Sequence, residues 1–286
     1  MSTTISPLSP WTIRSHHFNW GDRTYLMGVL NVTPDSFSDG GLFNSLETAI
    51  DHARALIAAG TDILDIGGQS TRPKAVEISL DEELSRVIPI IEAVRQESAT
   101  PISIDTTRAE VAHAAIAAGA DIVNDISGAT YDEKMLPTVA TLKVPLILMH
   151  IRGTPQTMQQ LTDYDDVVGT IYTFLKARVE AAVNAGIERS RLAIDPGIGF
   201  AKTYDQNLDI LRRLPELKAL GCPLLVGASR KAFIGHILDK PNPKERVWGT
   251  AAACCGAIVG GADLLRIHDV RELRDVCRVA DAIFRH

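Results

Sequence analysis

Short apolar runs alternate with longer helical patterns along almost the whole chain, and this alternation restricts the fold more than any other feature. Each run reads as a buried parallel strand, because such strands are apolar throughout. The eight runs are Tyr25–Leu30, Ile63–Ile66, Ile102–Ile104, Ile122–Asn124, Pro145–Met149, Leu192–Ile194, Leu224–Val226 and Leu264–Ile267. Helical periodicity lies between them at Ser45–Ala59, Leu80–Arg95, Arg108–Ala118, Tyr164–Ala185 and Val270–Ile283.

A weak connector repeat supports this pattern. Ala59–Asp62, Ala118–Asp121 and Gly260–Asp263 each end a helical pattern with glycine and precede a strand. Glycine past a helix end adopts the left-handed conformation at little cost. We therefore predict an α/β protein with one (β/α)₈ TIM barrel over residues 24–286, after an N-terminal extension over residues 1–23. An open doubly wound sheet is the alternative, but no G-x-G-x-x-G motif follows an early strand.

Composition restricts the class of partner. The formal net charge of −6 argues against a basic surface for nucleic acid. The four cysteines show no C-x-x-C spacing and are expected to be buried residues of a reducing compartment. The first residues contain no apolar signal core, and no apolar stretch is long enough to cross a membrane. We therefore expect a cytoplasmic protein with small-molecule substrates and no nucleic-acid or membrane partner.

Polar residues follow nearly every predicted strand, at the end where barrel enzymes place their chemistry. They are Asn31, Asp65, Asp105, Asn124 with Asp125, His150, Asp195, Lys231 and Arg266 with His268 and Asp269. Any one of them could be a turn former or a helix cap, and Asp125 and Asp269 fit that role well. Taken together, they predict a polar mouth, because unpaired buried polar groups are costly.

Two kinds of ligand group fit these residues. Asp105, Asn124 and Asp195 can bind the N–H edge of a guanine-like or pterin-like heterocycle, and Lys231 can donate to its opposite edge. Arg266 and His268 share one strand face and, with Asn31, form a candidate anion site. The alternative is a set of structural Asp–Arg and Asp–Lys pairs that line the barrel. Polar, glycine-bearing loops at residues 33–41 and 67–73 are typical of mobile lids.

Eight ordered segments, from about residue 25 to the end, resemble the signatures of the dihydropteroate synthase family. They are Leu30–Gly41, Asp65–Pro73, Ser103–Thr106, Asn124–Gly128, Met149–His150 with Gly153–Met158, Asp195–Phe200, Ser229–Gly235 and Arg266–Asp269. The resemblance implies a (β/α)₈ barrel. It also implies that 6-hydroxymethyl-7,8-dihydropterin diphosphate condenses with 4-aminobenzoate to give 7,8-dihydropteroate and diphosphate, a step of folate synthesis.

The resemblance also implies residue roles. The pterin would contact Asp105, Asn124, Met149, Asp195 and Lys231. The diphosphate would contact Asn31, Thr71, Arg266 and His268, with Mg²⁺ at Asn31. The aminobenzoate would contact Thr71, Arg72, Pro73, Phe200 and Lys231. Phe37 and Asp39 would lie on the first loop, and family members are commonly homodimers, here through residues 249–262 and the last helix.

A dissociative reaction is the expected mechanism. Diphosphate leaves when its charge is neutralised by Mg²⁺, Arg266 and His268, and the dihydropterin ring delocalises the resulting cation. Asp39 would stabilise that cation and Arg72 would steer the arylamine, so Asp39, Arg72 and Lys231 are the expected catalytic residues.

Two departures from the family and two rival functions remain. Position 69 is Gln where the family usually has Glu, and position 232 is Ala where Ser is common. A methyltetrahydrofolate methyltransferase domain would share the pterin-binding residues without needing a diphosphate site. A catalytically silent homologue would bind pterins or a protein partner only.

Overall fold

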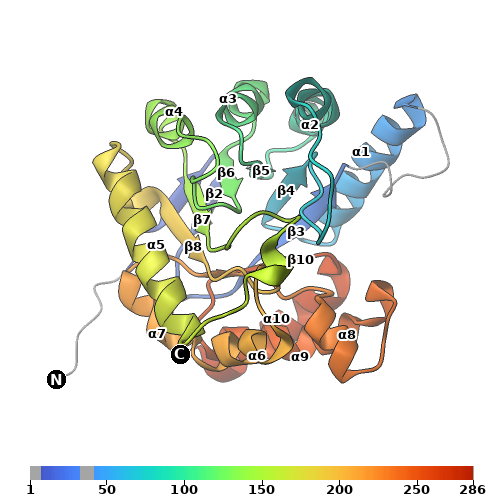
Figure 1. Ribbon diagram of the computed structural model, residues 1–286. Coiled ribbons are helices and arrows are strands. Elements are labelled where there is room, and N and C mark those ends of the chain that lie inside the picture. Colours follow the sequence, from blue (N-terminus) through green and yellow to red (C-terminus); the bar gives the residue numbers. More distant parts are fainter. Residues whose placement is uncertain (1–7, 33–41, 286) are drawn as a thin grey trace.

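The computed structural model describes residues 8–32 and 42–285. Its centre is a parallel sheet of eight strands with the spatial order β8-β7-β6-β5-β4-β3-β10-β9, surrounded by helices (Figure 1). The strands are β3 (Tyr25–Asn31), β4 (Ile63–Gly67), β5 (Ile102–Asp105), β6 (Ile122–Asp125), β7 (Leu146–Met149), β8 (Leu192–Asp195), β9 (Leu225–Val226) and β10 (Leu264–Ile267).

The two edge strands of this sheet meet and close it. A parallel bridge joins Ile194 of β8 to Leu224, immediately before β9, and the Ile194 amide donates to the Pro223 carbonyl at 2.9 Å. Every strand therefore has two neighbours, as a barrel requires. The predicted (β/α)₈ barrel is confirmed, and each predicted strand is present within a residue or two of its expected bounds.

Helices connect successive strands and form the outer layer. They are α1 (Leu42–Ala58), α2 (Leu80–Glu97), α3 (Ala109–Ala118), α4 (Met135–Leu142), α5 (Val167–Asn184), α6 (Tyr204–Arg212), α7 (Leu214–Leu217), α8 (Ala232–Ile237), α9 (Val247–Val259) and α10 (Val270–Phe284). All five helical patterns expected from periodicity are present, although α5 begins three residues later than expected. The described residues include no helix long and apolar enough to span a membrane.

The connector repeat has a clear structural role. Gly60, Gly119 and Gly261 all have positive φ angles, of 94°, 116° and 88°. The aspartate two residues after each glycine accepts a hydrogen bond from a strand amide. Asp62 binds the Leu26 amide at 2.8 Å, Asp121 binds the Ile102 amide at 2.9 Å and Asp263 binds the Leu224 amide at 2.8 Å. Each carboxylate also pairs with a cation, so the repeat fastens one strand to the next.

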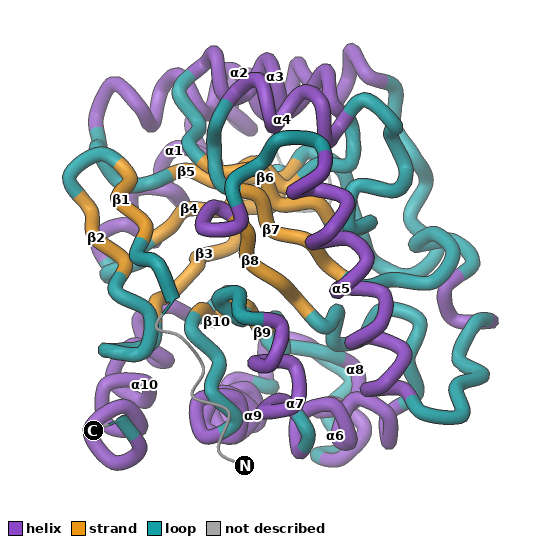
Figure 2. Tube along the Cα trace, turned by 90° about the vertical axis from the view of Figure 1, so that its left-hand side faces the viewer, coloured by secondary structure: helices purple, strands orange, loops and turns teal. Residues whose placement is uncertain are grey.

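A short antiparallel hairpin, β1 (Trp11–Ile13) with β2 (His16–Phe18), covers the end of the barrel where the strands begin (Figure 2). Its buried side chains form one apolar cluster with residues inside the barrel, namely Tyr25, Met27, Ile63, Ile122, Ile147, Ala193, Leu225 and Leu264. The Trp11 indole also donates to the Ser190 carbonyl at 2.7 Å. The sequence analysis treated residues 1–23 only as an extension and did not predict this hairpin.

Strand geometry determines which side chains reach the opposite, open end. Side chains two residues apart face the same side of a strand. The interior residues Ile63, Ile122, Ile147, Ala193 and Leu264 are therefore followed, two positions later, by a second interior layer. That layer consists of Asp65, Asn124, Met149, Asp195 and Arg266, and the Asp105 side chain joins it from β5.

Candidate active site

The carboxylate and amide side chains predicted to bind a heterocycle lie together at the mouth of the barrel. Asp105 and Asp195 end β5 and β8, and Asn124 is the last residue but one of β6; each is only 4–5% exposed. An apolar cluster that contains Met149, Ile126 and Phe200 borders them. A flat ring could therefore present its edge to polar groups and its face to apolar side chains.

Arg266 joins this group of side chains through two ion pairs. Its Nε atom donates to Asp65 at 2.6 Å, and its Nη2 atom donates to Asp105 at 2.7 Å. The Asn124 amide lies 3.4 Å from both carboxylate oxygens of Asp65. Burial raises the pKa of Asp105 to about 7, against the opposing effect of the Arg266 charge. One guanidinium thus serves two buried carboxylates.

This arrangement modifies the division of roles expected from the sequence. Arg266 was expected in a separate anion site, whereas its guanidinium lies among the residues of the proposed pterin site. The structural Asp–Arg pairing that was kept as an alternative is therefore present at this residue. Asp65, which is fully buried, was noted at a strand end but not predicted as a site residue. The sequence could have identified it, because it lies two residues after an interior side chain of β4 and therefore faces the inside of the barrel.

Lys231 and Phe200 lie against each other at the same mouth. The Lys231 Nζ atom lies 4.2 Å from the centroid of the Phe200 ring. Burial, with the neighbouring Arg266 charge, lowers the pKa of Lys231 to about 8. Gly199 has a φ angle of 83°, and a Cβ atom there would lie 2.9 Å from the Lys231 side chain. The loop after β8 therefore requires glycine at this close approach.

His268 differs from the cation expected at this position. Its Nδ1 atom lies 3.0 Å from the Ser229 hydroxyl, and its backbone amide also donates to that hydroxyl. Burial and the nearby positive charges, first that of Arg230, lower the pKa of His268 to about 3. In the protein alone, the imidazole is therefore neutral near pH 7 and contributes a hydrogen bond rather than a charge. Ser229 was not predicted as a site residue.

The remaining predicted residues lie on the rim. Asn31 is half-buried at the end of β3, next to Gly67 of β4. Thr71 is half-buried, whereas Arg72 and Pro73 are exposed on the loop between β4 and α2. Arg72 is near enough to His268 to lower the pKa of its imidazole. The predicted residues Phe37 and Asp39 lie outside the described residues.

The sequence predicted Asp125 and Asp269 as turn formers or helix caps. Asp125 accepts hydrogen bonds from the amide and hydroxyl of Ser127, and Asp269 forms an ion pair with Arg230. Both aspartates therefore brace loops, as expected.

Gln69 holds the loop that carries Thr71, Arg72 and Pro73. Its amide nitrogen donates to the carbonyls of Ser70 and Val76 at 2.9 and 3.0 Å. Its amide oxygen accepts from the Ile78 amide at 2.8 Å. A glutamate, the usual family residue, could accept the third bond but could not donate the first two when ionised.

Replacing Gln69 by leucine is expected to loosen this loop, because all three hydrogen bonds are lost. The KM for 4-aminobenzoate, the substrate that the loop is expected to contact, should rise several-fold. Protease cleavage within residues 70–78 should accelerate. Gln69→Glu should give an intermediate effect. Gln96→Glu, an exposed change on α2 away from the mouth, is the control. Unchanged KM and cleavage in Gln69→Leu would contradict this role.

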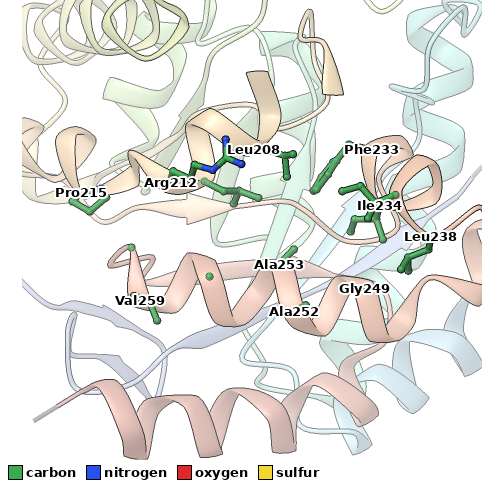
Figure 3. A pocket seen from close by; sticks show the side chains of 14 residues that line it. Leu208, Arg212, Pro215, Phe233, Ile234, Leu238, Gly249, Ala252, Ala253 and Val259 are labelled. Atoms are coloured by element: carbon green, nitrogen blue, oxygen red, sulfur yellow. The ribbon is translucent and has the colours of Figure 1, made fainter. Parts of the chain in front are cut away.

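Two cavities differ in character. One of about 150 Å³ reaches Asp105 from the loop side and is lined partly by Thr71, Ile126 and Pro155. A larger one, of about 570 Å³, lies outside the barrel between α6, α8 and α9 and is mostly apolar (Figure 3). Only the first adjoins converging polar groups, so the chemistry is assigned to the mouth.

The described residues contain no group of three or more His, Cys, Asp or Glu side chains that could hold a metal ion. The half-buried Asn31 amide offers one oxygen ligand. Mg²⁺ commonly binds through one or two protein oxygens together with substrate phosphates and water. The residues thus fit an ion that arrives with a diphosphate.

Comparisons with known proteins agree with a pterin site in a TIM barrel. The family described as "Pterin binding enzyme" matches residues 27–268, so the chain belongs to the pterin-binding enzymes. Within that family it belongs with the dihydropteroate synthases. The one from Synechocystis sp. is 62% identical, covering 94% of this chain and 93% of its own length, and that from Bacillus subtilis is 46% identical, covering 93% and 90%.

Solved structures give the same result. Dihydropteroate synthase from Xanthomonas albilineans with 4-aminobenzoic acid is 43% identical and has a TM-score of 0.90, covering 96% of this chain and 98% of that one. The same enzyme in complex with 7,8-dihydropteroate has a TM-score of 0.87 at 42% identity, with the same coverage.

Proposed function

We propose that this chain condenses 6-hydroxymethyl-7,8-dihydropterin diphosphate with 4-aminobenzoate, releasing 7,8-dihydropteroate and diphosphate. One observation carries the assignment to the mouth of the barrel. Asp105, Asn124 and Asp195 meet there from three strands, beside an apolar cluster. These groups match the amidine-like edge and flat face of a pterin.

The pterin is proposed to bind deepest in the mouth. Asp105 and Asp195 accept hydrogen bonds from its N–H groups, while Asn124 both donates and accepts. Lys231 donates to the opposite edge, and Met149 contacts the ring face. Because these carboxylates are buried, water does not compete for their hydrogen bonds to a ligand.

The diphosphate is proposed to lie toward the rim, near Asn31, Thr71, Arg266 and His268. The cations that act on His268 at this position are Arg230, Arg266, Lys231 and the exposed Arg72. Mg²⁺, held by Asn31 and the phosphates, would supply further charge neutralisation. Aminobenzoate would then occupy the outer mouth between Thr71, Arg72, Pro73, Phe200 and Lys231.

The reaction is proposed to proceed by dissociation. The bond between the exocyclic methylene carbon and the diphosphate oxygen breaks, and the bonding pair leaves with diphosphate. The arylamine nitrogen then attacks the methylene cation and loses a proton. No protein nucleophile takes part, so the side chains position substrates and stabilise charge. Asp39 is proposed to face the cation and Arg72 to orient the arylamine.

Mixing the purified protein with both substrates is the decisive assay. We expect diphosphate release that requires the pterin diphosphate and Mg²⁺, and formation of 7,8-dihydropteroate when the arylamine is also present. A methyltetrahydrofolate methyltransferase domain or a silent homologue would bind a pterin and release no diphosphate. Pterin binding without release would therefore overturn the proposed activity and leave only a pterin-binding role.

A second copy of this chain is the proposed protein partner. The apolar groove in Figure 3 is bordered by exposed Ile237 and Val259, which are 56% and 59% exposed, with Trp248 nearby at 70%. Exposed apolar patches of this kind mark protein interfaces. A cytoplasmic location also remains a prediction from the sequence.

Sedimentation should give the mass of a homodimer at micromolar concentration. Replacing the exposed Ala252 on α9 by arginine should yield a monomer, because a charge would then be buried in the contact. Glu110→Arg, an exposed change on α3, should leave the dimer intact. A wild-type protein that sediments as a monomer would contradict the proposal.

A further inference from the structure

A buried lysine lies beneath the proposed substrate sites and has no role in the reaction described above. Lys202 ends the loop after β8 and is 3% exposed. It forms no ion pair with any carboxylate of residues 8–32 and 42–285. Its Nζ atom instead donates to the Phe200 carbonyl at 2.7 Å and lies 3.1 Å from Nδ1 of His150. A buried amine without a paired carboxylate is costly, so its presence calls for a physical reason.

His150 provides a fixed attachment point on the barrel. It follows β7 directly, is 1% exposed and donates its backbone amide to the Asp195 carbonyl at 3.0 Å. Its ring packs edge-on against Phe174, with centroids 5.0 Å apart. Burial lowers the pKa of His150 to about 2, so its Nδ1 atom can accept a hydrogen bond from Lys202 at neutral pH. Burial, the backbone hydrogen bond to Asp195 and the contact with Phe174 hold this ring on the barrel.

The loop between Asp195 and Lys202 lies directly on this histidine. Gly197 has a φ angle of 70°, and a Cβ atom there would lie 2.0 Å from the His150 carbonyl oxygen. The Gly197 amide donates to Oδ1 of Asp195 at 2.7 Å, and the Phe200 amide donates to the Gly197 carbonyl. Lys202 closes this chain of contacts by binding both Phe200 and His150.

We infer that Lys202 is a positioning residue. Its two hydrogen bonds tie the Asp195–Lys202 loop to His150 and thereby fix the position of the Phe200 ring at the mouth of the barrel. The inference rests on the proposed function, because Phe200 matters only if aminobenzoate binds against it. The Phe200 ring also contacts Lys231. One buried tether therefore sets two side chains of the proposed aminobenzoate site.

Replacing Lys202 by methionine removes the N–H donors and keeps the length of the side chain. We expect the KM for 4-aminobenzoate to rise about tenfold while kcat falls less than about threefold. Hydrogen exchange of amides 197–203 should accelerate in the substrate-free protein. Exchange in the strands of the barrel should remain unchanged. Lys176→Met, on the exposed face of α5, is the matched control.

The exchange measurement requires no turnover, so it separates failure of this inference from failure of the proposed function. Unchanged exchange at 197–203 with a KM within about twofold of wild type would overturn the inference. Faster exchange throughout the barrel would also overturn it, because Lys202 would then be a general stabilising residue.

Variants of His150 keep the test decisive if Lys202→Met does not fold. His150→Asn retains an acceptor near the position of Nδ1, whereas His150→Leu removes it. Only the leucine variant should show a raised KM for aminobenzoate and faster exchange at 197–203. Equal behaviour of the two variants would overturn the role assigned to the tether.

Discussion

Replacing Arg266 by methionine is expected to lower the free energy of unfolding by about 3–5 kcal/mol near pH 8, because two buried carboxylates lose their cation. Arg266 donates to both Asp65 and Asp105, and its own side chain is only 21% exposed. The loss is large because removing one partner leaves uncompensated charge in a poorly solvated site. Denaturant unfolding followed by circular dichroism measures the change.

The size of this effect should depend on pH. Without Arg266, the pKa of Asp105 should rise further above its unfolded value, since burial already raises it to about 7 with the guanidinium present. Above about pH 7 the folded variant should then hold a proton that folded wild type has released, whereas below about pH 7 both folded states hold it. The difference in stability from wild type should therefore shrink as the pH falls toward 7 and change little below it.

Arg278→Met provides the control for this experiment. Arg278 is exposed on α10, so its replacement should change the free energy of unfolding by less than about 0.5 kcal/mol. A pH-independent loss in Arg266→Met, or no loss at pH 8, would contradict the view that this guanidinium neutralises the two carboxylates.

Replacing Asp195 by alanine is expected to weaken pterin binding by about 2–4 kcal/mol, because ligand N–H groups are left without an acceptor in a buried site. Oδ1 of Asp195 already accepts the Gly197 amide at 2.7 Å, so the other oxygen is the one proposed to face the ligand. Titration calorimetry with a pterin gives the affinity directly. Unchanged affinity would remove Asp195 from the pterin site.

The pH dependence of this affinity gives a second test. Burial raises the pKa of Asp195 to about 6. Below that pH the carboxyl group is protonated and loses acceptor capacity, so wild-type affinity should fall between pH 7 and pH 5. Asp195→Ala lacks this group and should show a smaller change over the same range, which also corrects for titration of the ligand itself.

The sequence predicted the barrel well because one local rule repeats along it. Apolar runs such as Ile63–Ile66 and Leu264–Ile267 alternate with helical periodicity, and local periodicity survives in the folded chain. The short helices α4, α7 and α8 gave no comparable signal, because four to eight residues contain too few helical turns. The N-terminal hairpin also escaped prediction, since its three-residue strands are stabilised by packing on the barrel.

The site was predicted in part for the same reason. Residues at strand ends, such as Asp105, Asn124 and Asp195, were identified because parallel strands bring their carboxyl ends to one mouth. The sequence analysis grouped Arg266 with the anion-binding residues, whereas its guanidinium pairs with carboxylates from two other strands. His268 was expected to carry charge, but burial and neighbouring cations make it neutral.

The sequence by itself determined the eightfold alternation, the glycine–aspartate connectors and the set of polar residues at the strand ends, since each depends on neighbours within a few positions. Only the tertiary structure decided that Arg266 serves both Asp65 and Asp105 and that Lys202 ties Phe200 to His150. The partners in these contacts lie up to 201 residues apart in the chain. Closure of the barrel brings them within hydrogen-bond distance, and burial then sets their charge.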